Sequence, residues 1–160
     1  MRIHIGCIGR LKTGPERALF ERYAERIAKA GRGVALGPLS VIERPESRAA
    51  RADDRKAEEA RALLDALPAG TVVLALDETG KTRASAAFAD DLAALRDTGV
   101  QDLAFLIGGA DGHGAAVLAA ARSTLSLGPM TFPHQVVRAL VAEQIYRAIT
   151  ILSGHPYHRA

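Results

Sequence analysis

The stretch TVVLALD (71–77) decides the fold, because it is apolar from Val72 to Leu76 without interruption. A second run of the same kind, DLAFLIGG (102–109), follows it, and SAAFADDLAALRD (85–97) between them places apolar residues at helical spacing. Continuous apolar strands are typical of a sheet that is buried on both faces. Strand, helix and strand in this order predict an α/β fold with a mainly parallel sheet flanked by helices on both sides.

The rest of the chain continues this alternation. Between the first two segments we expect a turn over ETGKTRAS (78–85), with Gly80 inside it and Ser85 as the N-cap of the helix. No repeat, low-complexity segment or linker interrupts the chain, so we expect one domain, 1–160. Further strands are predicted at 2–9, at 34–43 with an interruption at Gly37-Pro38, and at 124–128. Further helices are predicted at 16–31, 53–67, 112–123 and 133–154.

Composition restricts the class of protein. Apolar residues make up 48% and charged residues 24% of the chain, as is ordinary for a globular protein. No apolar run approaches the ~18 residues of a membrane span, and the opening MRIHIGCIGR (1–10) is too short and too interrupted for a signal peptide. We therefore expect a cytoplasmic protein without a membrane partner. Cys7 stands alone, which rules out an internal disulfide, and its apolar surroundings predict a buried side chain.

The charge is unevenly distributed along the chain. The net charge is only +3, yet residues 1–61 hold 14 Lys and Arg against 9 Asp and Glu. A basic half suits a polyanion such as RNA, although cations that merely solvate a loop and a helix start explain it equally well.

Three predicted strand exits carry the candidate binding residues: LDETGK (76–81), IGGADGHG (107–114) and LGPMTFPH (127–134). Ligands of open α/β sheets bind beyond the carboxyl ends of the strands. The glycines of the second exit allow close approach of a ligand, and a tight turn accounts for them as well. Their spacing is neither GxGxxG nor a Walker A loop. The third exit suits a flat apolar slot for an adenine, or an ordinary strand-to-helix connection.

The last helix and the tail hold a few polar residues. Glu143 and Arg147 are spaced for an ion pair within the helix, and His134 and Arg138 lie beside the proposed pocket with the same spacing. The tail, SGHPYHRA (153–160), has two histidines without nearby carboxylates, which is a poor metal site. With one cysteine and no HExxH or GxSxG motif, we expect no metal, and a cofactor that carries the reactive group is favoured.

Taken together, these segments resemble the RlmH family of ribosomal RNA methyltransferases in the SPOUT superfamily. The matching pieces are IHIGCIGRLK, LDETGK, FLIGGADGHG and the long block LSLGPMTFPHQVVRALVAEQIYRAITILSGHPYHRA. They occur in the family's order from residue 3 to the end of the chain, and the last block is highly specific. The middle, about 32–70, matches only in length and helical character.

The resemblance implies an α/β fold with a trefoil knot near the C-terminus, whose loops bind S-adenosyl-L-methionine. It also implies a homodimer in which each active site uses residues of both chains, with the tail over the cofactor. Carried over to this sequence, the cofactor-binding residues are Leu76, Gly108, Leu127, Gly128, Pro129, Met130, Thr131 and Phe132.

The reaction implied by the resemblance is methylation of N3 of a pseudouridine in 23S rRNA, in a stem-loop of the assembled 70S ribosome. The imide proton on N3 must leave, so His158 is a candidate base, and Arg159 and Arg138 are candidates to hold a phosphate or the imidate. Tyr157 is placed to stack on the base. Arg10, Lys12 and Arg17 are predicted to contact phosphates. Two alternatives are a different nucleotide-cofactor α/β enzyme and a non-catalytic ribosome-associated factor.

Overall fold

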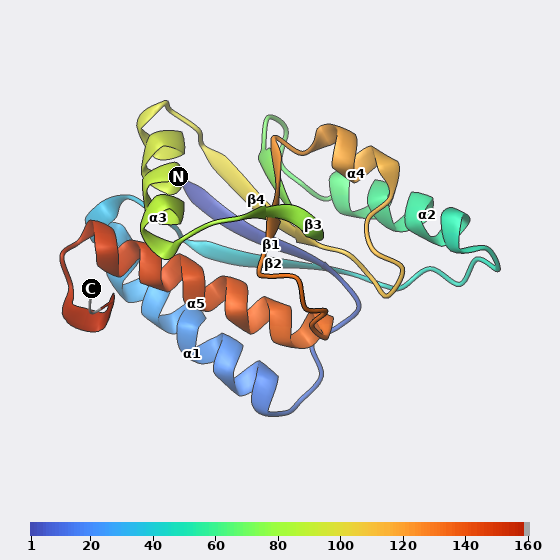
Figure 1. The fold of residues 1–160 in the computed structure, drawn as a ribbon, viewed down its shortest axis with the longest axis horizontal. Helices are drawn as coiled ribbons and strands as arrows, with labels where there is room; N and C mark the ends of the chain where they lie inside the picture. The colour runs from blue at the N-terminus through green and yellow to red at the C-terminus, as the bar shows by residue number, and fades with distance from the viewer. Residues whose placement is uncertain (159–160) are drawn as a thin grey trace.

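A computed structural model describes residues 1–158, and over these residues it contains one sheet of five parallel strands (Figure 1). The strand order is β2-β1-β4-β3-β5, so β1, β4 and β3 lie inside and β2 and β5 form the edges. The mainly parallel sheet is thus confirmed. The strands are β1 (Arg2–Ile8), β2 (Leu39–Arg44), β3 (Val72–Thr82), β4 (Asp102–Ile107) and β5 (Ser123–Ser126).

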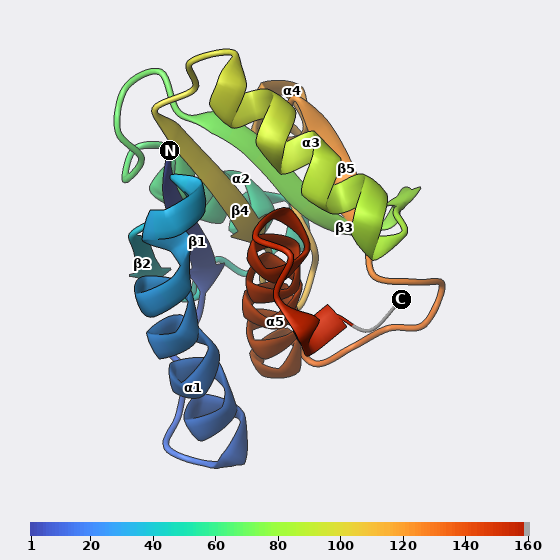
Figure 2. The same ribbon diagram turned by 90° about the vertical axis from the view of Figure 1, so that its left-hand side faces the viewer.

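Helices cover both faces of the sheet (Figure 2). One face carries α1 (Pro15–Ala30), α3 (Ser85–Asp97) and α5 (His134–Leu152), and the other carries α2 (Ala52–Leu64) and α4 (Ala115–Ala120). Short 3-10 turns, η1 (Gly31–Val34) and η2 (Pro156–His158), follow α1 and α5. Within residues 1–158, no helix combines the length and the apolar character needed to cross a membrane.

The core lies on both sides of the central strands, as the apolar runs predict. Every residue of β4 is buried. Its side chains alternate between the two layers, with Phe105 facing α3 and α5 and Leu106 facing α2. Cys7 of β1 is fully buried, and burial raises the pKa of its thiol to about 12. The prediction of a buried cysteine is therefore confirmed.

The predicted turn after β3 is wrong, because the strand does not stop at Asp77 but continues to Thr82. After an irregularity beyond Leu76, β3 pairs with β5 a second time. Gly80 lies directly on the backbone of β5, where an added Cβ would be 2.8 Å from the carbonyl carbon of Leu125. This close crossing of two chain segments lies where the resemblance places the knot.

Other boundaries also differ from the prediction. Ser85 does not cap α3: Ala84 occupies the N-cap position, and the Ser85 hydroxyl donates to Oε1 of Gln144 on α5 at 2.9 Å. α4 begins at Ala115 rather than at 112, because Gly112 has a φ of +82°, which no helix accommodates. The interruption predicted at Gly37-Pro38 is confirmed, but only the part after it is a strand: β2 begins at Leu39, and Val34 belongs to η1.

Candidate functional site

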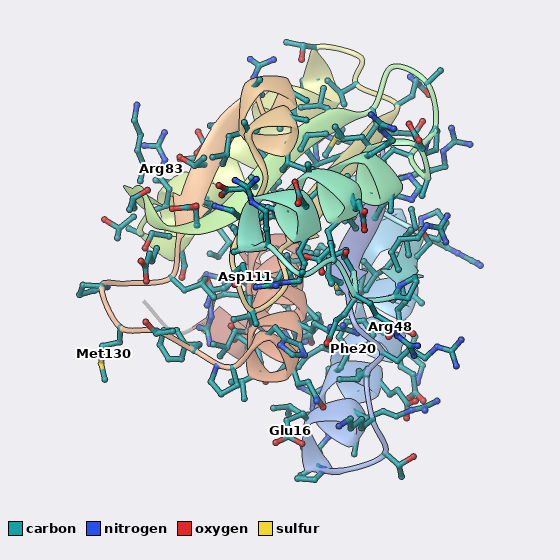
Figure 3. The ribbon with its side chains drawn as sticks, turned by 90° about the vertical axis from the view of Figure 1, so that its right-hand side faces the viewer. Glu16, Phe20, Arg48, Arg83, Asp111 and Met130 are labelled. Carbon is teal, nitrogen blue, oxygen red and sulfur yellow. The ribbon has the colours of Figure 1, made fainter. Side chains whose placement is uncertain are left out.

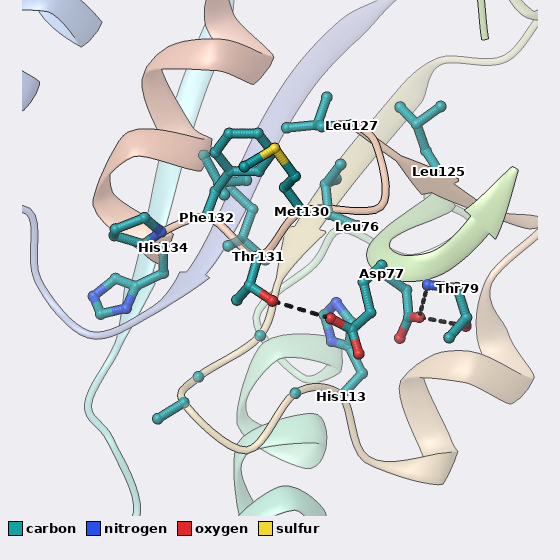
Figure 4. Close-up of a pocket in the computed structure, with 18 of the residues that line it drawn as sticks. Leu76, Asp77, Thr79, His113, Leu125, Leu127, Met130, Thr131, Phe132 and His134 are labelled. Atoms are coloured by element: carbon teal, nitrogen blue, oxygen red, sulfur yellow. Dashed lines mark hydrogen bonds between the residues drawn. The ribbon is translucent and has the colours of Figure 1, made fainter. Parts of the chain in front are cut away.

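A cavity of about 610 Å³ opens at the carboxyl ends of β3, β4 and β5 (Figure 4). Parallel strands end at one edge of the sheet, so the loops that follow them meet there. The walls come from residues 76–79 of β3, at the irregularity that begins after Leu76, from 107–113 at the end of β4 and from the segment that joins β5 to α5. The three strand exits identified in the sequence therefore surround one cavity.

Most of the predicted cofactor-binding residues lie in the wall of this cavity. Pro129 does not, although both of its neighbours do. Met130 and Phe132 form an apolar lip that is 71% and 37% exposed, and Met130 projects outward from its loop (Figure 3). The predicted residues in the wall are Leu76, Gly108, Leu127, Gly128, Met130, Thr131 and Phe132.

The glycine turn after β4 is close-packed against itself. A Cβ on Gly108 would lie 2.9 Å from the carbonyl carbon of Gly112, which is itself in the left-handed region. The amide of Gly112 donates to the carbonyl of Gly109 at 3.1 Å. Turn geometry alone thus requires glycine here, and it leaves bare backbone facing the cavity.

The cavity is acidic. Asp77, Glu78 and Asp111 line it, and no Lys or Arg among residues 1–158 does so, but Asp111 is paired with Arg55 outside the wall at 2.7 Å. Oδ1 of Asp77 accepts hydrogen bonds from the hydroxyl of Thr79 at 2.6 Å and from its amide at 2.8 Å, and these bonds lower the pKa of Asp77. Oε2 of Glu78 accepts from the hydroxyl of Thr131 across the mouth of the cavity at 3.4 Å. At neutral pH this lining favours a cationic ligand.

The role of these acids was not predicted. Asp77 and Glu78 stand in the LDETGK exit, which the sequence did single out, but only Leu76 was assigned to the cofactor there. Their position directly after the apolar run of β3 was the available signal. Within residues 1–158, His, Cys, Asp and Glu side chains form no group of three or more that could hold a metal ion.

Two histidines complete the wall. His134, at the start of α5, lines the cavity as its position in the sequence suggested. His113 is buried, and its Nε2 donates to the carbonyl of Leu106 at 3.1 Å, while its Nδ1 has no hydrogen-bond partner. Burial lowers the pKa of His113, so the ring is neutral at pH 7.

Arg138 does not reach the cavity. Its side chain is 1% exposed, and its guanidinium donates to Oε1 of Glu43 at 2.6 Å and to the carbonyls of Ile8 and Gly9 at 3.1 and 2.7 Å. A buried cation needs such partners, and they hold Arg138 against the end of β1. Within residues 1–158, the structure brings His134 to the cavity and Arg138 to the core, although both lie on the same helix.

The C-terminal tail packs along α5 rather than over the cavity of its own chain. The Tyr157 ring meets Tyr146 edge-on at 4.8 Å between centroids, and its hydroxyl donates to Oε1 of Glu143 at 3.1 Å. Burial and the contacts of the hydroxyl with Tyr23 and Glu143 raise the pKa of Tyr157. None of residues 153–158 lines the cavity. His158 lies in η2, and Arg159 lies outside the described residues.

Glu143 also forms the ion pair predicted from its spacing, with 2.6 Å between its Oε1 and Nη2 of Arg147. The Arg147 guanidinium stacks over Tyr157, 5.1 Å from the ring centroid. The pair therefore has a structural role within the chain, because it fixes the aromatic side chain of the tail against α5.

Known proteins place the chain in a family. Residues 1–158 match the family model described as "Predicted SPOUT methyltransferase". The chain is 57% identical to the ribosomal RNA large subunit methyltransferase H of Xanthobacter autotrophicus and 56% identical to that of Rhizobium meliloti, over the full length of both proteins in each case. The chain belongs to the RlmH family of SPOUT methyltransferases. The cavity of this RlmH-family chain is lined from three of the matching segments, LDETGK, FLIGGADGHG and the long block that begins at Leu125.

Among solved structures, the RlmH-family chain is similar to the SpoU methyltransferase AviRb from Streptomyces viridochromogenes, solved in complex with AdoMet. The identity is 13% and the TM-score is 0.43, with 91% of this chain and 57% of that chain covered.

Proposed function

We propose that the protein transfers the methyl group of S-adenosyl-L-methionine to N3 of a pseudouridine in 23S rRNA, in a stem-loop of the assembled 70S ribosome. The name shared by its relatives supports the substrate class, and the family supports the donor. The observation that carries the proposal is the acidic cavity at three strand exits. A ribosomal substrate also supports a cytoplasmic location.

The cavity fits S-adenosyl-L-methionine in size and charge. Its volume of about 610 Å³ lies within the range of small-molecule sites. The donor carries a sulfonium and an ammonium, which the carboxylates of Asp77 and Glu78 attract, and Leu127 and Phe132 offer apolar surface for the adenine. A dinucleotide would instead bring a pyrophosphate to the carboxylates of Asp77 and Glu78, in a wall that no Lys or Arg among residues 1–158 lines. The charge therefore disfavours the alternative of another nucleotide-cofactor enzyme.

When bound, the donor supplies an activated methyl group, so the protein must align the acceptor and remove its proton. His158 is the proposed acceptor of the N3 proton, and Arg159 is proposed to stabilise the imidate. Tyr157 is proposed to stack on the base. Arg138 is buried, so for this residue we propose a positioning role instead of contact with the substrate.

We propose that the active site forms between two chains of a homodimer. The tail of one chain leaves its own cavity uncovered, because Tyr157 is held on the middle of α5 by Glu143 and Tyr146. The exposed apolar lip of Met130 and Phe132 is the surface that such a cover would bury. The tail of the partner would then complete each cavity.

The test is methyl transfer from labelled S-adenosyl-L-methionine to 70S ribosomes and to free subunits, followed by mapping of the modified nucleotide. We expect transfer to 70S ribosomes alone, at N3 of one pseudouridine. Calorimetry with S-adenosyl-L-methionine and NADH tests the cofactor in parallel. Absence of both transfer and donor binding would favour the alternative of a non-catalytic ribosome-associated factor.

A further inference from the structure

Two loops beside the cavity carry exposed cations that have no ion-pair partner. They follow β1 and β2, and within residues 1–158 none of the four side chains forms a salt bridge. Unpaired cations at such density are the surface feature that phosphate contacts use. We call these four side chains the basic ledge: Arg10, Lys12, Arg48 and Arg51.

The basic ledge adjoins the cavity at the same edge of the sheet. The amide of Gly9 donates to the carbonyl of Arg44 at 2.8 Å, so the loops after β1 and β2 leave the sheet side by side. A Cβ on Gly9 would lie 3.6 Å from Nε2 of His134, which lines the cavity. Figure 3 shows this edge, with Arg48 on one side of Asp111 and Met130 on the other.

The loop after β1 is held in place by the ion pair between the buried Arg138 and the half-buried Glu43. The amide of Leu11 donates to Oε1 of Glu43 at 2.7 Å, and the same oxygen accepts from Nη1 of Arg138 at 2.6 Å. The Arg138 guanidinium also holds the carbonyl of Gly9 at 2.7 Å. The backbone that carries Arg10 and Lys12 is therefore positioned before any ligand arrives.

The loop after β2 is fixed by α2. The amide of Ser47 donates to Oε1 of the buried Glu59 at 2.9 Å, and Nη1 of Arg55 donates to the carbonyls of Ala49 and Ala50 at 3.1 and 3.0 Å. Nε of Arg55 donates to Oδ2 of Asp111, in the glycine turn of the cavity, at 2.7 Å. Arg55 thus connects the loop that carries Arg48 and Arg51 to the cavity wall.

We infer that the basic ledge binds phosphates of the RNA strand next to the target nucleotide and thereby directs the target base into the cavity. This inference rests on the proposed function. Preorganised cations position a nucleic acid backbone without reading its sequence. Glu46 lies beside Gly9 and offsets part of the charge, which suits positioning more than strong binding. Arg17, also predicted from the sequence as a phosphate contact, is paired with Glu21 at 2.7 Å and is not included.

The experiment removes two charges at a time. The variants are Arg10→Gln/Lys12→Gln and Arg48→Gln/Arg51→Gln. The matched control is Lys29→Gln/Arg32→Gln, which removes the same charge near the end of α1. The amino group of Met1 donates to the carbonyl of Ala35 there at 2.8 Å, so this control lies beside the amino end of β1, at the opposite end of the strands from the cavity. Binding to 70S ribosomes is measured over a series of KCl concentrations, together with kcat and KM for methyl transfer.

We expect each ledge variant to reduce the slope of log K against log salt by about 1 to 2 and to raise KM for ribosomes. The affinity for S-adenosyl-L-methionine should not change, because none of the four ledge side chains lines the cavity, and the control should retain the wild-type slope. Wild-type slopes in both ledge variants, or an equal loss in the control, would overturn the inference. If the wild type transfers no methyl group, the proposed function fails, while its salt-dependent binding still tests the ledge separately.

Discussion

At the scale of single residues, His113 in the cavity wall makes the stability of the fold depend on pH. Burial lowers the pKa of His113 below its ordinary value of 6.5, so the unfolded chain binds a proton more readily than the folded protein. Linkage then requires that the stability from the neutral ring is complete above the ordinary pKa of histidine and declines as the pH falls below it.

We therefore expect the free energy of unfolding in urea to fall between about pH 7 and pH 5, and to fall less in His113→Gln, which cannot take up the proton. Parallel urea titrations of both proteins at each pH give the difference. If the two curves run parallel throughout this range, His113 does not titrate as described.

Two residues show what spacing can and cannot predict. His134 and Arg138 are four apart, which places both on one side of α5. Spacing could not show that the first faces the cavity and the second the end of β1, because the partners of Arg138 are carbonyls from the other end of the chain. Such contacts depend on tertiary packing, which the sequence of α5 alone does not contain.

At the scale of elements, the crossing of β3 over β5 depends on Gly80. A methyl group there would enter the backbone of β5, 2.8 Å from the carbonyl carbon of Leu125. Backbone cannot move aside as a flexible side chain can, so we expect Gly80→Ala to lower the free energy of unfolding by about 1–3 kcal/mol or more.

Gly33→Ala is the matched control, because a Cβ at Gly33 meets no atom within 4 Å. Urea denaturation should show little or no loss of stability for this variant. Equal stability of the two variants would mean that the backbones of β3 and β5 are not in such close contact at Gly80.

The elements predicted best are those determined by their own residues. The apolar runs of β4 and of the first part of β3 were predicted with nearly correct boundaries. The extension of β3 to Thr82 was not, because pairing with β5 is contributed by residues more than forty positions later in the sequence. The cap at Ser85 failed for a similar reason, since Gln144 of α5 competes for its hydroxyl.

At the scale of the whole molecule, the position of the tail predicts complementation between two inactive proteins. One variant loses the cavity, by Thr131→Arg, which places a bulky cation beside Glu78. The other loses the tail, by alanine at Tyr157, His158 and Arg159. If the tail of one chain completes the cavity of its partner, a mixed dimer contains one intact site.

Unfolding and refolding the two variants together should restore roughly a quarter of the wild-type activity, because half of the dimers are mixed and each has one of two sites. The measurement is methyl transfer to ribosomes, and each variant refolded alone is the control. Activity that stays at the level of the single variants would place the tail in the active site of its own chain, and a monomer by light scattering would refute the dimer.

Family resemblance predicted more at this scale than composition or periodicity could. The knot and the dimer were expected from it alone. The middle of the chain, about 32–70, matched the family only in length and helical character. Its helix, α2, supplies Arg55 and Glu59, which hold the loop of the basic ledge. These contacts join distant segments, so no local pattern in that stretch pointed to them.

The acidic lining of the cavity has a consequence for turnover on the proposed reaction. Methyl transfer converts the sulfonium of the donor to a neutral thioether, so the spent product has one positive charge fewer than the donor. The carboxylates of Asp77 and Glu78 therefore attract the product less than the molecule that entered. The same side chains that favour loading of the donor thus favour product release once the methyl group has left.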